Sequence, residues 1–431
     1  MAVVFIGGTE KITEETDLNS LSYPVVFEAE PLVGINYALS KYKPDLTIDL
    51  SDEPVVGYIE RFKFASYILK AGVSYLGADF RFDPPIFHDI VTKPSISIIG
   101  TGKRVGKTAV SAYICRLLEK AGLSPLVVAM GRGGPEEPEV LEGKKLHITP
   151  QFLLKASKEG KHAASDHYED ALMSRVTTVG CRRCGGGMAG APFISNVLEG
   201  ASLANKLKEE LVIFEGSGSA LPPIRTDMRV VVVGADQPVE YIGGYLGPYR
   251  LLISDLVILT MCEEPMASQE KVDLLKETIG KVNPDLKVIK TIFRPRPLEN
   301  ISGRQIFLAT TASLKMKGVL KDYLEKEFDC EVVGISNNLS NRPKLKRDLE
   351  RHKGKFTTIL TELKAASVDV VTSMGLEMGA DVIYMDNEPV VIGEDGELED
   401  ALVGLAKESI SKFRRRKKRG KSQERRKKYP N

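Results

Sequence analysis

Short apolar runs alternate with longer stretches of helical periodicity through the middle of the chain. The runs are almost free of polar residues, as strands buried on both faces are, and lie at 96–99, 125–130, 211–214, 230–233, 256–260 and 288–293. Helical stretches separate several of them. One of these is the spacing Val110, Ile114, Leu117 and Leu118, which ends at Gly122. Strands that alternate with helices predict a doubly wound, mostly parallel α/β sheet over residues 93–293.

Two smaller α/β patterns flank this region. Residues 1–92 show strand-like runs at 3–6, 24–27, 46–50 and 73–79, with a helix expected over 59–70. Residues 294–411 show runs at 305–310, 330–335, 368–371 and 382–384. We therefore expect an N-terminal α/β domain (1–92), a central P-loop domain (93–293), a C-terminal α/β domain (294–411) and a tail (412–431).

A glycine-rich loop between the first central strand and the first central helix is the clearest chemical signal. It reads Gly-Thr-Gly-Lys-Arg-Val-Gly-Lys-Thr over residues 100–108. Such a turn points backbone N–H groups at the phosphates of a nucleotide. Lys107 is expected to reach the β- and γ-phosphates, and the Thr108 hydroxyl to bind Mg²⁺. The predicted nucleotide-binding residues are Gly102, Lys103, Arg104, Val105, Gly106, Lys107, Thr108 and Ala109.

An acidic residue at the end of another buried strand gives the second signal. Glu215 follows the run 211–214 and precedes Gly216 and Gly218, which let backbone approach a ligand closely. At the switch point of such a sheet this carboxylate would bind Mg²⁺ or order its water shell. The guanine signature Asn-Lys-x-Asp is absent, which favours ATP over GTP. Gly102 stands where partitioning ATPases have a second lysine, which disfavours that class.

Arginines in glycine-rich segments give the third signal. Arginine forks bind phosphate bidentately, and neighbouring glycines let backbone amides join them. Several such segments at one sheet edge would hold a second polyanion beside ATP, with Arg132 in a catalytic position. The expected contacts are Arg104, Arg132, Arg182, Arg183, Gly186 and Arg225.

Two further segments leave alternatives open. In the polar stretch 160–170, His162 and Asp166 are candidate substrate contacts, but Ser165 or Asp166 could equally cap the helix that follows. The pair Cys181 and Cys184 could be half of a zinc site or a redox pair, but small residues that shape a turn explain it as well.

Composition and charge agree with an enzyme of the cytoplasm. Of the 431 residues 42% are hydrophobic, and no apolar run approaches membrane-spanning length. The start lacks the basic residues of a secretory leader, and the five cysteines are too scattered for a disulfide framework. Residues 412–431 hold twelve Lys or Arg and one Glu, a net of +11, so the rest of the +2 chain carries 2 − 11 = −9. We expect this tail to be disordered and to bind nucleic acid weakly at most.

The P-loop and the strand-end Glu215-Gly216 resemble dethiobiotin synthetase and its relatives. The wider set of motifs resembles the cyclic 2,3-diphosphoglycerate synthetase family over nearly the whole chain up to about residue 405. These motifs are the P-loop, Gly-Arg-Gly-Gly-Pro at 131–135, the stretch 162–170, Cys-Arg-Arg-Cys-Gly-Gly-Gly at 181–187 and Glu-Gly-Ser-Gly at 215–218.

The resemblance implies an ATP-dependent ligase that closes 2,3-diphosphoglycerate into a ring through an internal phosphoanhydride, releasing ADP and phosphate. It also implies Mg²⁺, K⁺ as a further ion, and a thermophilic archaeal source; a homodimer is expected on general grounds. Two alternatives stay open: a P-loop kinase that makes 2,3-diphosphoglycerate from 2-phosphoglycerate, and a nucleotide-switched protein that holds nucleic acid through the basic tail.

Overall fold

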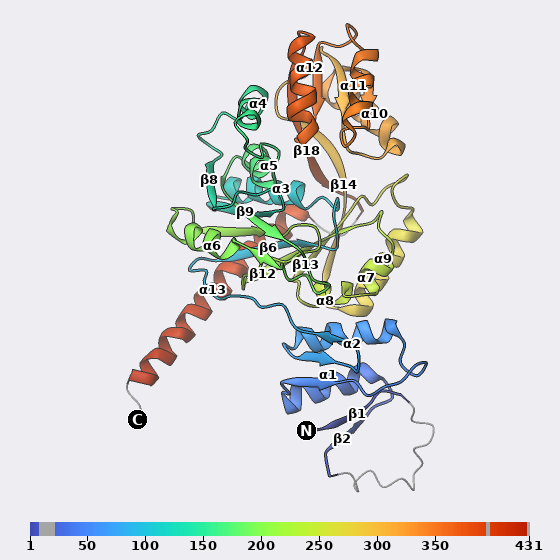
Figure 1. Ribbon diagram of the computed structural model, residues 1–431, viewed down its shortest axis with the longest axis vertical. Helices are drawn as coiled ribbons and strands as arrows, with labels where there is room; N and C mark the ends of the chain where they lie inside the picture. Colours follow the sequence, from blue (N-terminus) through green and yellow to red (C-terminus); the bar gives the residue numbers. More distant parts are fainter. Residues whose placement is uncertain (8–21, 394–396, 429–431) are drawn as a thin grey trace.

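Three α/β bodies lie in a row along the long axis of the molecule, with the P-loop domain in the middle (Figure 1). The computed structural model describes residues 1–7, 22–393 and 397–428, the segment 420–428 by its backbone alone. Among the described residues, no helix is both long enough and apolar enough to cross a bilayer.

The central domain is built on seven parallel strands, and this confirms the predicted sheet. Their order is β9 (Thr177–Cys184), β7 (Pro125–Gly131), β11 (Leu211–Glu215), β6 (Ser95–Gly100), β12 (Met228–Gly234), β13 (Leu256–Thr260) and β14 (Lys287–Pro297). Two short strands, β8 (Glu139–Glu142) and β10 (Ile194–Ser195), pair antiparallel with β9. The order reverses between β6 and β11, so the P-loop and Glu215 leave neighbouring strands at one edge.

Helices cover both faces of this sheet because its strands are apolar on both. Ile98, Val230 and Val232 pack under α3 (Lys107–Lys120) and α13 (Leu398–Lys428), whereas Val231 and Val233 face the other way. The second face is covered by α6 (Val197–Lys206), α8 (Gly247–Leu252) and α9 (Gln269–Val282). Three further helices complete the domain: α4 (Pro150–Lys158), α5 (Asp166–Ser174) and α7 (Glu240–Gly243).

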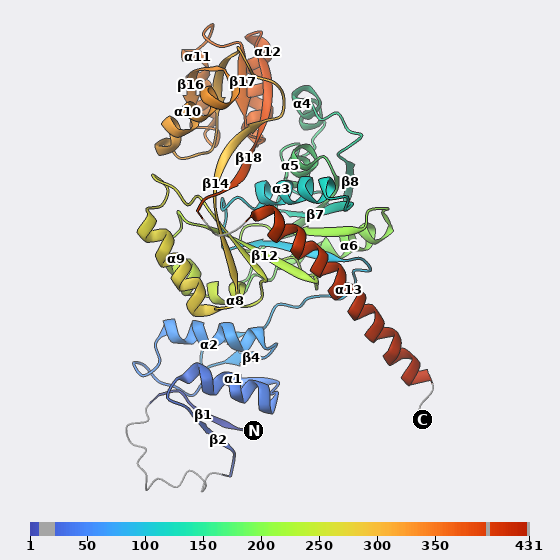
Figure 2. The same cartoon turned by 180° about the vertical axis from the view of Figure 1, so that it is seen from behind.

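A two-stranded ribbon leads from the central domain to the C-terminal domain. Strand β14 continues beyond the central sheet and pairs antiparallel with β18 (Asp381–Val391), from Thr291 opposite Val391 to Pro297 opposite Met385. Beyond the ribbon, parallel strands follow in the order β18, β17 (Thr358–Thr361), β15 (Gln305–Ala309) and β16 (Glu331–Ser336). The helices here are η3 (Leu314–Met316), α10 (Lys317–Phe328), α11 (Arg342–Arg351), the π-helix η4 (Ser367–Val371) and α12 (Thr372–Glu377). Helix α13 then returns to the central domain (Figure 2).

The N-terminal domain packs on the opposite end of the central domain through α2 (Tyr58–Lys70), which lies against α8. It also contains α1 (Pro31–Tyr42), a parallel pair β1 (Val3–Phe5) and β2 (Val25–Phe27), and a sheet of β3 (Leu46–Ile48), β4 (Ser74–Leu76) and β5 (Arg81–Phe82). The helix expected over 59–70 is therefore confirmed as α2.

Two predictions of local structure are wrong. Residues 368–371, expected as a strand, lie in the π-helix η4, because a buried β-branched run packs as well in a helix as in a strand. The tail 412–428, expected to be disordered, continues α13 outward as a helix, and Lys412 and Arg416 form ion pairs with Asp255 and with Asp89 and Asp227. The predicted domain end at 411 therefore divides a helix whose first half packs on the P-loop domain.

Candidate active site

The loop 100–108 connects β6 to α3 and has the backbone of a phosphate cradle. Gly106, which precedes the first residue of α3, has φ +89°, and Arg104 has φ +62°. A Cβ on Gly106 would come within 2.2 Å of the Phe293 ring, so this position has no room for a side chain. Lys107 is 8% exposed and donates from Nζ to the carbonyl of Gly102 at 2.8 Å. The lysine is thus folded back over the loop, where the phosphates would lie.

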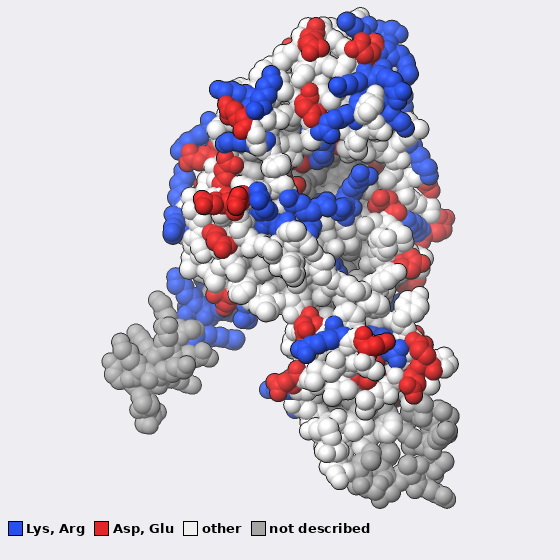
Figure 3. Space-filling model, viewed as in Figure 1, with Lys and Arg blue, Asp and Glu red and all other residues white. Residues whose placement is uncertain are grey.

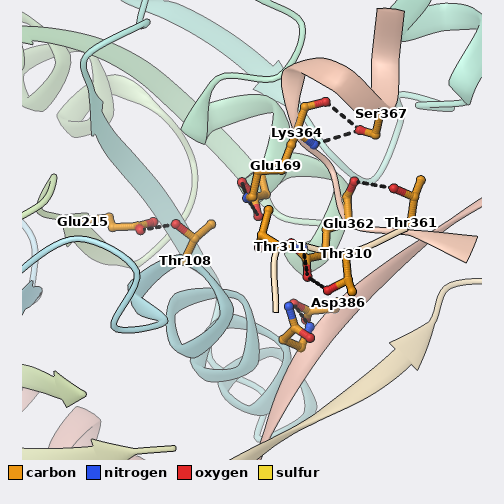
Figure 4. Close-up of polar contacts among 11 residues, drawn as sticks. Thr108, Glu169, Glu215, Thr310, Thr311, Thr361, Glu362, Lys364, Ser367 and Asp386 are labelled. Carbon is orange, nitrogen blue, oxygen red and sulfur yellow. Dashed lines mark hydrogen bonds and ion pairs between the residues drawn. The ribbon is translucent and has the colours of Figure 1, made fainter. Parts of the chain in front are cut away.

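A pair of buried carboxyl groups lies beside the start of α3. Thr108 donates from Oγ1 to Oε1 of Glu215 at 2.7 Å (Figure 4). Asp170, on α5, is fully buried and lies within hydrogen-bonding reach of Glu215 when one of the two carries a proton. Burial, and after it the charge of Asp166, raises the pKa of Glu215 to about 7. Burial also raises the pKa of Asp170, with Glu215 as the next cause.

Lys107 balances part of this negative charge. Burial lowers the pKa of Lys107 to about 8, against the charges of Glu215 and Asp166, which raise it. Asp166 begins α5 and lies against Gly131, at the carboxyl end of β7, where a Cβ would meet Oδ2 at 3.1 Å. Asp166 therefore lies beside the loop that follows β7. Ser165 is the N-cap residue of α5, but its hydroxyl contacts Nδ1 of His167 instead of a backbone N–H.

Arg183 is the arginine built most deeply into the site. It is 9% exposed, and its guanidinium donates to the carbonyls of Gly185 and Ser217, both at 2.8 Å. Among the described residues, no carboxylate forms an ion pair with it, and its Nε has no partner. Burial lowers the pKa of Arg183, and the nearby charge of Arg132 lowers it further. A buried cation with neutral partners alone is suited to receive an anion.

Other predicted contacts lie around this arginine. Arg132 and Lys103 are exposed, and a Cβ on Gly218 would lie 3.5 Å from Lys103 and 3.4 Å from Arg183. Gly186 lies beside Arg183, 3.5 Å from Nη1 by the same measure. Figure 3 shows a hollow between the central and C-terminal domains, with lysines and arginines gathered on its rim. Basic side chains therefore lie around this hollow.

One predicted contact lies elsewhere, at the opposite end of the sheet. Arg225 lies near the amino end of the sheet, 3.9 Å from Asp89, because the loop after Glu215 runs back along β6 until Asp227 contacts Ser95. The expectation that it shares an edge with Arg183 is wrong. Arg182 lies within β9, and its Nε donates to the carbonyl of Gly134 at 2.8 Å. His162 is exposed, and its backbone carbonyl accepts from Ser165.

Comparison with known proteins identifies the family of this chain. Three domains described as belonging to cyclic 2,3-diphosphoglycerate synthetase match the chain: the N-terminal domain over 1–83, the P-loop domain over 95–292 and the C-terminal domain over 297–388. The cyclic 2,3-diphosphoglycerate synthetase of Methanothermus fervidus is 52% identical over 422 residues, covering 96% of this chain and 92% of that protein. The chain belongs to the cyclic 2,3-diphosphoglycerate synthetase family.

A second curated relative bears the same name. The cyclic 2,3-diphosphoglycerate synthetase of Rubrobacter xylanophilus is 53% identical over 398 residues, covering 92% of this chain and 89% of that protein. Among solved structures, LpxK from Aquifex aeolicus in complex with ATP aligns at a TM-score of 0.46 and 15% identity, over 82% of this chain and 96% of that one. The resemblance drawn from the motifs is confirmed by the curated relatives.

A divalent cation fits beside Thr108 on the chemistry of the donors. Oε2 of Glu215 and both carboxyl oxygens of Asp170 are buried and have no donor partner. Mg²⁺ in phosphate sites is held by one or two carboxylates together with hydroxyl, water and phosphate oxygens. Within the described part of the chain, no group of three His, Cys, Asp or Glu side chains forms a metal site, Cys181 and Cys184 included. An ion that arrives with its nucleotide needs no such group.

Sequence reasoning missed several residues at this edge. Asp170 follows Asp166 by one helical turn, so the spacing i, i+4 could have indicated that both acids face the same way. Glu169, on the same helix, binds Lys364 of the C-terminal domain, 195 residues away (Figure 4). No local pattern could have indicated that contact, because it depends on how the two domains are placed.

Proposed function

We propose that this protein uses ATP to close 2,3-diphosphoglycerate into its cyclic phosphoanhydride, releasing ADP and inorganic phosphate. Arg183 is the observation that carries the proposal: a buried cation without a carboxylate partner, next to the P-loop lysine and Arg132. A second phosphate-rich ligand beside the γ-phosphate would explain this arrangement. The curated relatives, which bear the name of this activity, support the same substrate.

The proposed reaction has two phosphoryl transfers. First, an oxygen of one substrate phosphate attacks the γ-phosphorus of ATP, the bond to the β-phosphate oxygen breaks, and ADP leaves. This activates the substrate phosphate as a mixed anhydride. Then the other substrate phosphate attacks the phosphorus of its activated neighbour, and the γ-derived group leaves as inorganic phosphate. The ring contains the new P–O–P bond, so atoms and charges balance.

Phosphate oxygens are nucleophiles already, so neither step needs a general base. The requirement is to neutralise a substrate of about five negative charges and to align it with ATP. Lys107 would neutralise the β- and γ-phosphates, and Arg183 and Arg132 the acceptor. Thr108, Glu215 and Asp170 would hold Mg²⁺, which supplies charge neutralisation at the transferred phosphoryl group when bound.

The proposal also covers a further ion, the cellular compartment, the assembly and the binding of nucleic acid. By the family resemblance, K⁺ would be a further ion, and ATP as cosubstrate favours the cytoplasm. A homodimer is the expected assembly, which light scattering on the purified chain would measure. The basic half of α13 would bind nucleic acid weakly and with a steep salt dependence.

The deciding experiment is ³¹P NMR on the protein with ATP, Mg²⁺ and 2,3-diphosphoglycerate. Anhydride signals of a cyclic product, together with ADP and phosphate in equal amounts, are expected, and Lys107→Ala should abolish them. ATP left intact with this acceptor but consumed with 2-phosphoglycerate would support the kinase alternative instead. No consumption of ATP with either acceptor would refute both enzymatic proposals.

A further inference from the structure

At the carboxyl ends of its strands, the C-terminal domain contacts helix α5 of the central domain. In its sheet, the connection after β15 leads to β16 on one side, and the connection after β17 leads to β18 on the other. The carboxyl ends of β15 and β17 therefore form a switch point, the usual place for a ligand in an open α/β sheet. Thr310 and Thr311 follow β15, and Glu362 and Lys364 follow β17.

Lys364 is fixed at this edge from both ends. Its backbone N–H donates to Oγ of Ser367 at 2.8 Å, and that hydroxyl donates back to the carbonyl of Lys364 at 2.6 Å. Its ammonium contacts both carboxylate oxygens of Glu169 at 2.8 Å, across the interface between the two domains (Figure 4). Ser367 begins the π-helix η4, a conformation that is frequent at functional sites.

The carboxylate of Glu362, which lies on the same loop as Lys364, already accepts several hydrogen bonds. Glu362 is 5% exposed, accepts from the hydroxyls of Thr310 and Thr311, both at 2.5 Å, and accepts from the N–H of Thr311 at 3.2 Å. Burial alone would lower the pKa of Lys364, but the charges of Glu169 and Glu362 outweigh it and raise the pKa. The side chain is therefore an ammonium at neutral pH.

Glu169 orients the ammonium of Lys364 but engages only part of its hydrogen-bonding capacity. An ammonium has three N–H donors, and the contacts with Glu169 engage two of them. The Lys364 side chain remains 39% exposed, whereas its partner Glu169 is 16% exposed. Asp166 and Asp170 lie on the same helix as Glu169, so the contact with Glu169 brings Lys364 to the helix that carries these acids. One N–H donor of this fixed ammonium thus has no partner among the described residues.

We infer that Lys364 is an anion-binding residue of the acceptor site, contributed by the C-terminal domain, which holds a phosphate or carboxylate of the acceptor against the P-loop. The inference rests on the proposed function. The acceptor would then be bound by both domains, by Arg183 of the central domain and by Lys364 of the C-terminal domain. The nucleotide is held by the central domain alone.

The test is kinetic and calorimetric, on the full chain. Lys364→Met alone would leave Glu169 buried without its cation, so the main variant is the double substitution Lys364→Met with Glu169→Gln, which removes both charges. We expect its KM for 2,3-diphosphoglycerate to rise about 10- to 100-fold, the effect of one lost hydrogen bond to a charged group. The KM for ATP should stay within about twofold of the wild-type value, since ATP would contact the central domain. Calorimetric titration with 2,3-diphosphoglycerate alone should show the same loss of affinity.

Two controls separate binding from structure. Glu169→Gln alone keeps the ammonium but removes the carboxylate that orients it, so its KM for 2,3-diphosphoglycerate should rise less than in the double variant. Lys321→Met breaks the surface pair of Lys321 with Glu325 on α10 of the same domain and should behave as wild type. An unchanged acceptor KM in the double variant, or an equal rise in both KM values, would overturn the inference. The proposed function fails separately, if the wild-type protein forms no cyclic product.

Discussion

Replacing Gly106 by alanine tests whether the P-loop geometry is what binds the nucleotide. The residue has φ +89°, and a Cβ would lie 2.2 Å from Cζ and 2.5 Å from Cε2 of Phe293. The left-handed backbone costs an L-residue about 1–2 kcal/mol. Forcing the ring or the loop aside costs a further ~1–3 kcal/mol. We therefore expect the free energy of unfolding of Gly106→Ala to fall by about 2–5 kcal/mol, the sum of these two costs.

The chain offers two controls that separate these causes. Gly122 has φ +77° with nothing within 4 Å of its Cβ position, so Gly122→Ala isolates the backbone cost. Gly280, within α9, also has nothing within 4 Å and no positive φ, so Gly280→Ala should stabilise by about 0.5–1 kcal/mol. The midpoint temperature of thermal unfolding should be highest for Gly280→Ala, followed by wild type, Gly122→Ala and Gly106→Ala.

The kinetic consequence should be confined to the Gly106 variant. A loop displaced by about 1 Å lowers turnover on the order of 10²-fold, so kcat/KM for ATP should fall by about that factor. Adding Phe293→Ala removes the overlap and should recover part of both stability and activity. If Gly106→Ala keeps the wild-type KM for ATP and kcat, the argument from steric exclusion is wrong.

Three further predictions concern charges. Arg183→Met should lower kcat/KM for the acceptor about 10- to 100-fold, whereas Arg225→Met, at the opposite edge, should leave it unchanged in steady-state assays. Thr108→Val should raise the Mg²⁺ concentration needed for half-maximal activity, and chelation by EDTA should abolish turnover in both proteins; turnover that persists without Mg²⁺ would contradict the site. Burial alone would raise the pKa of Asp49, but hydrogen bonds from Ser51, Tyr75 and Arg61 lower it. The stability this carboxylate contributes is therefore present above its ordinary pKa of 3.8 and lost as the pH falls below it, so acid unfolding should be steeper in wild type than in Asp49→Asn.

Sequence reasoning worked where the determinants are local. Buried strands appear as apolar runs, and the P-loop is defined by neighbours in the chain, so β6, α3 and the position of Glu215 could all be predicted. It failed where a segment's direction matters. Arg225 and Arg183 both stand near glycine-rich segments, yet one loop runs back to the amino edge of the sheet while β9 carries the other arginine into the site.

Contacts between domains were beyond such reasoning. Arg116, on the P-loop helix, binds Asp386 of the ribbon at 2.7 Å, and Glu169 binds Lys364. Each pair joins residues that are far apart in sequence, and each side chain taken alone resembles an ordinary surface charge. Only the ribbon of β14 and β18, which directs the C-terminal domain toward the P-loop, brings them together.

The return of α13 to the central domain has a consequence for biosynthesis. Leu398, Leu402, Leu405 and Ala406 cover β6, which leads into the P-loop, and its neighbour β12. Chains emerge from the ribosome N-terminal end first, so the nucleotide-binding core stays partly uncovered until the C-terminal domain has been translated. The nascent protein cannot complete its ATP-binding domain before the domain that faces it exists.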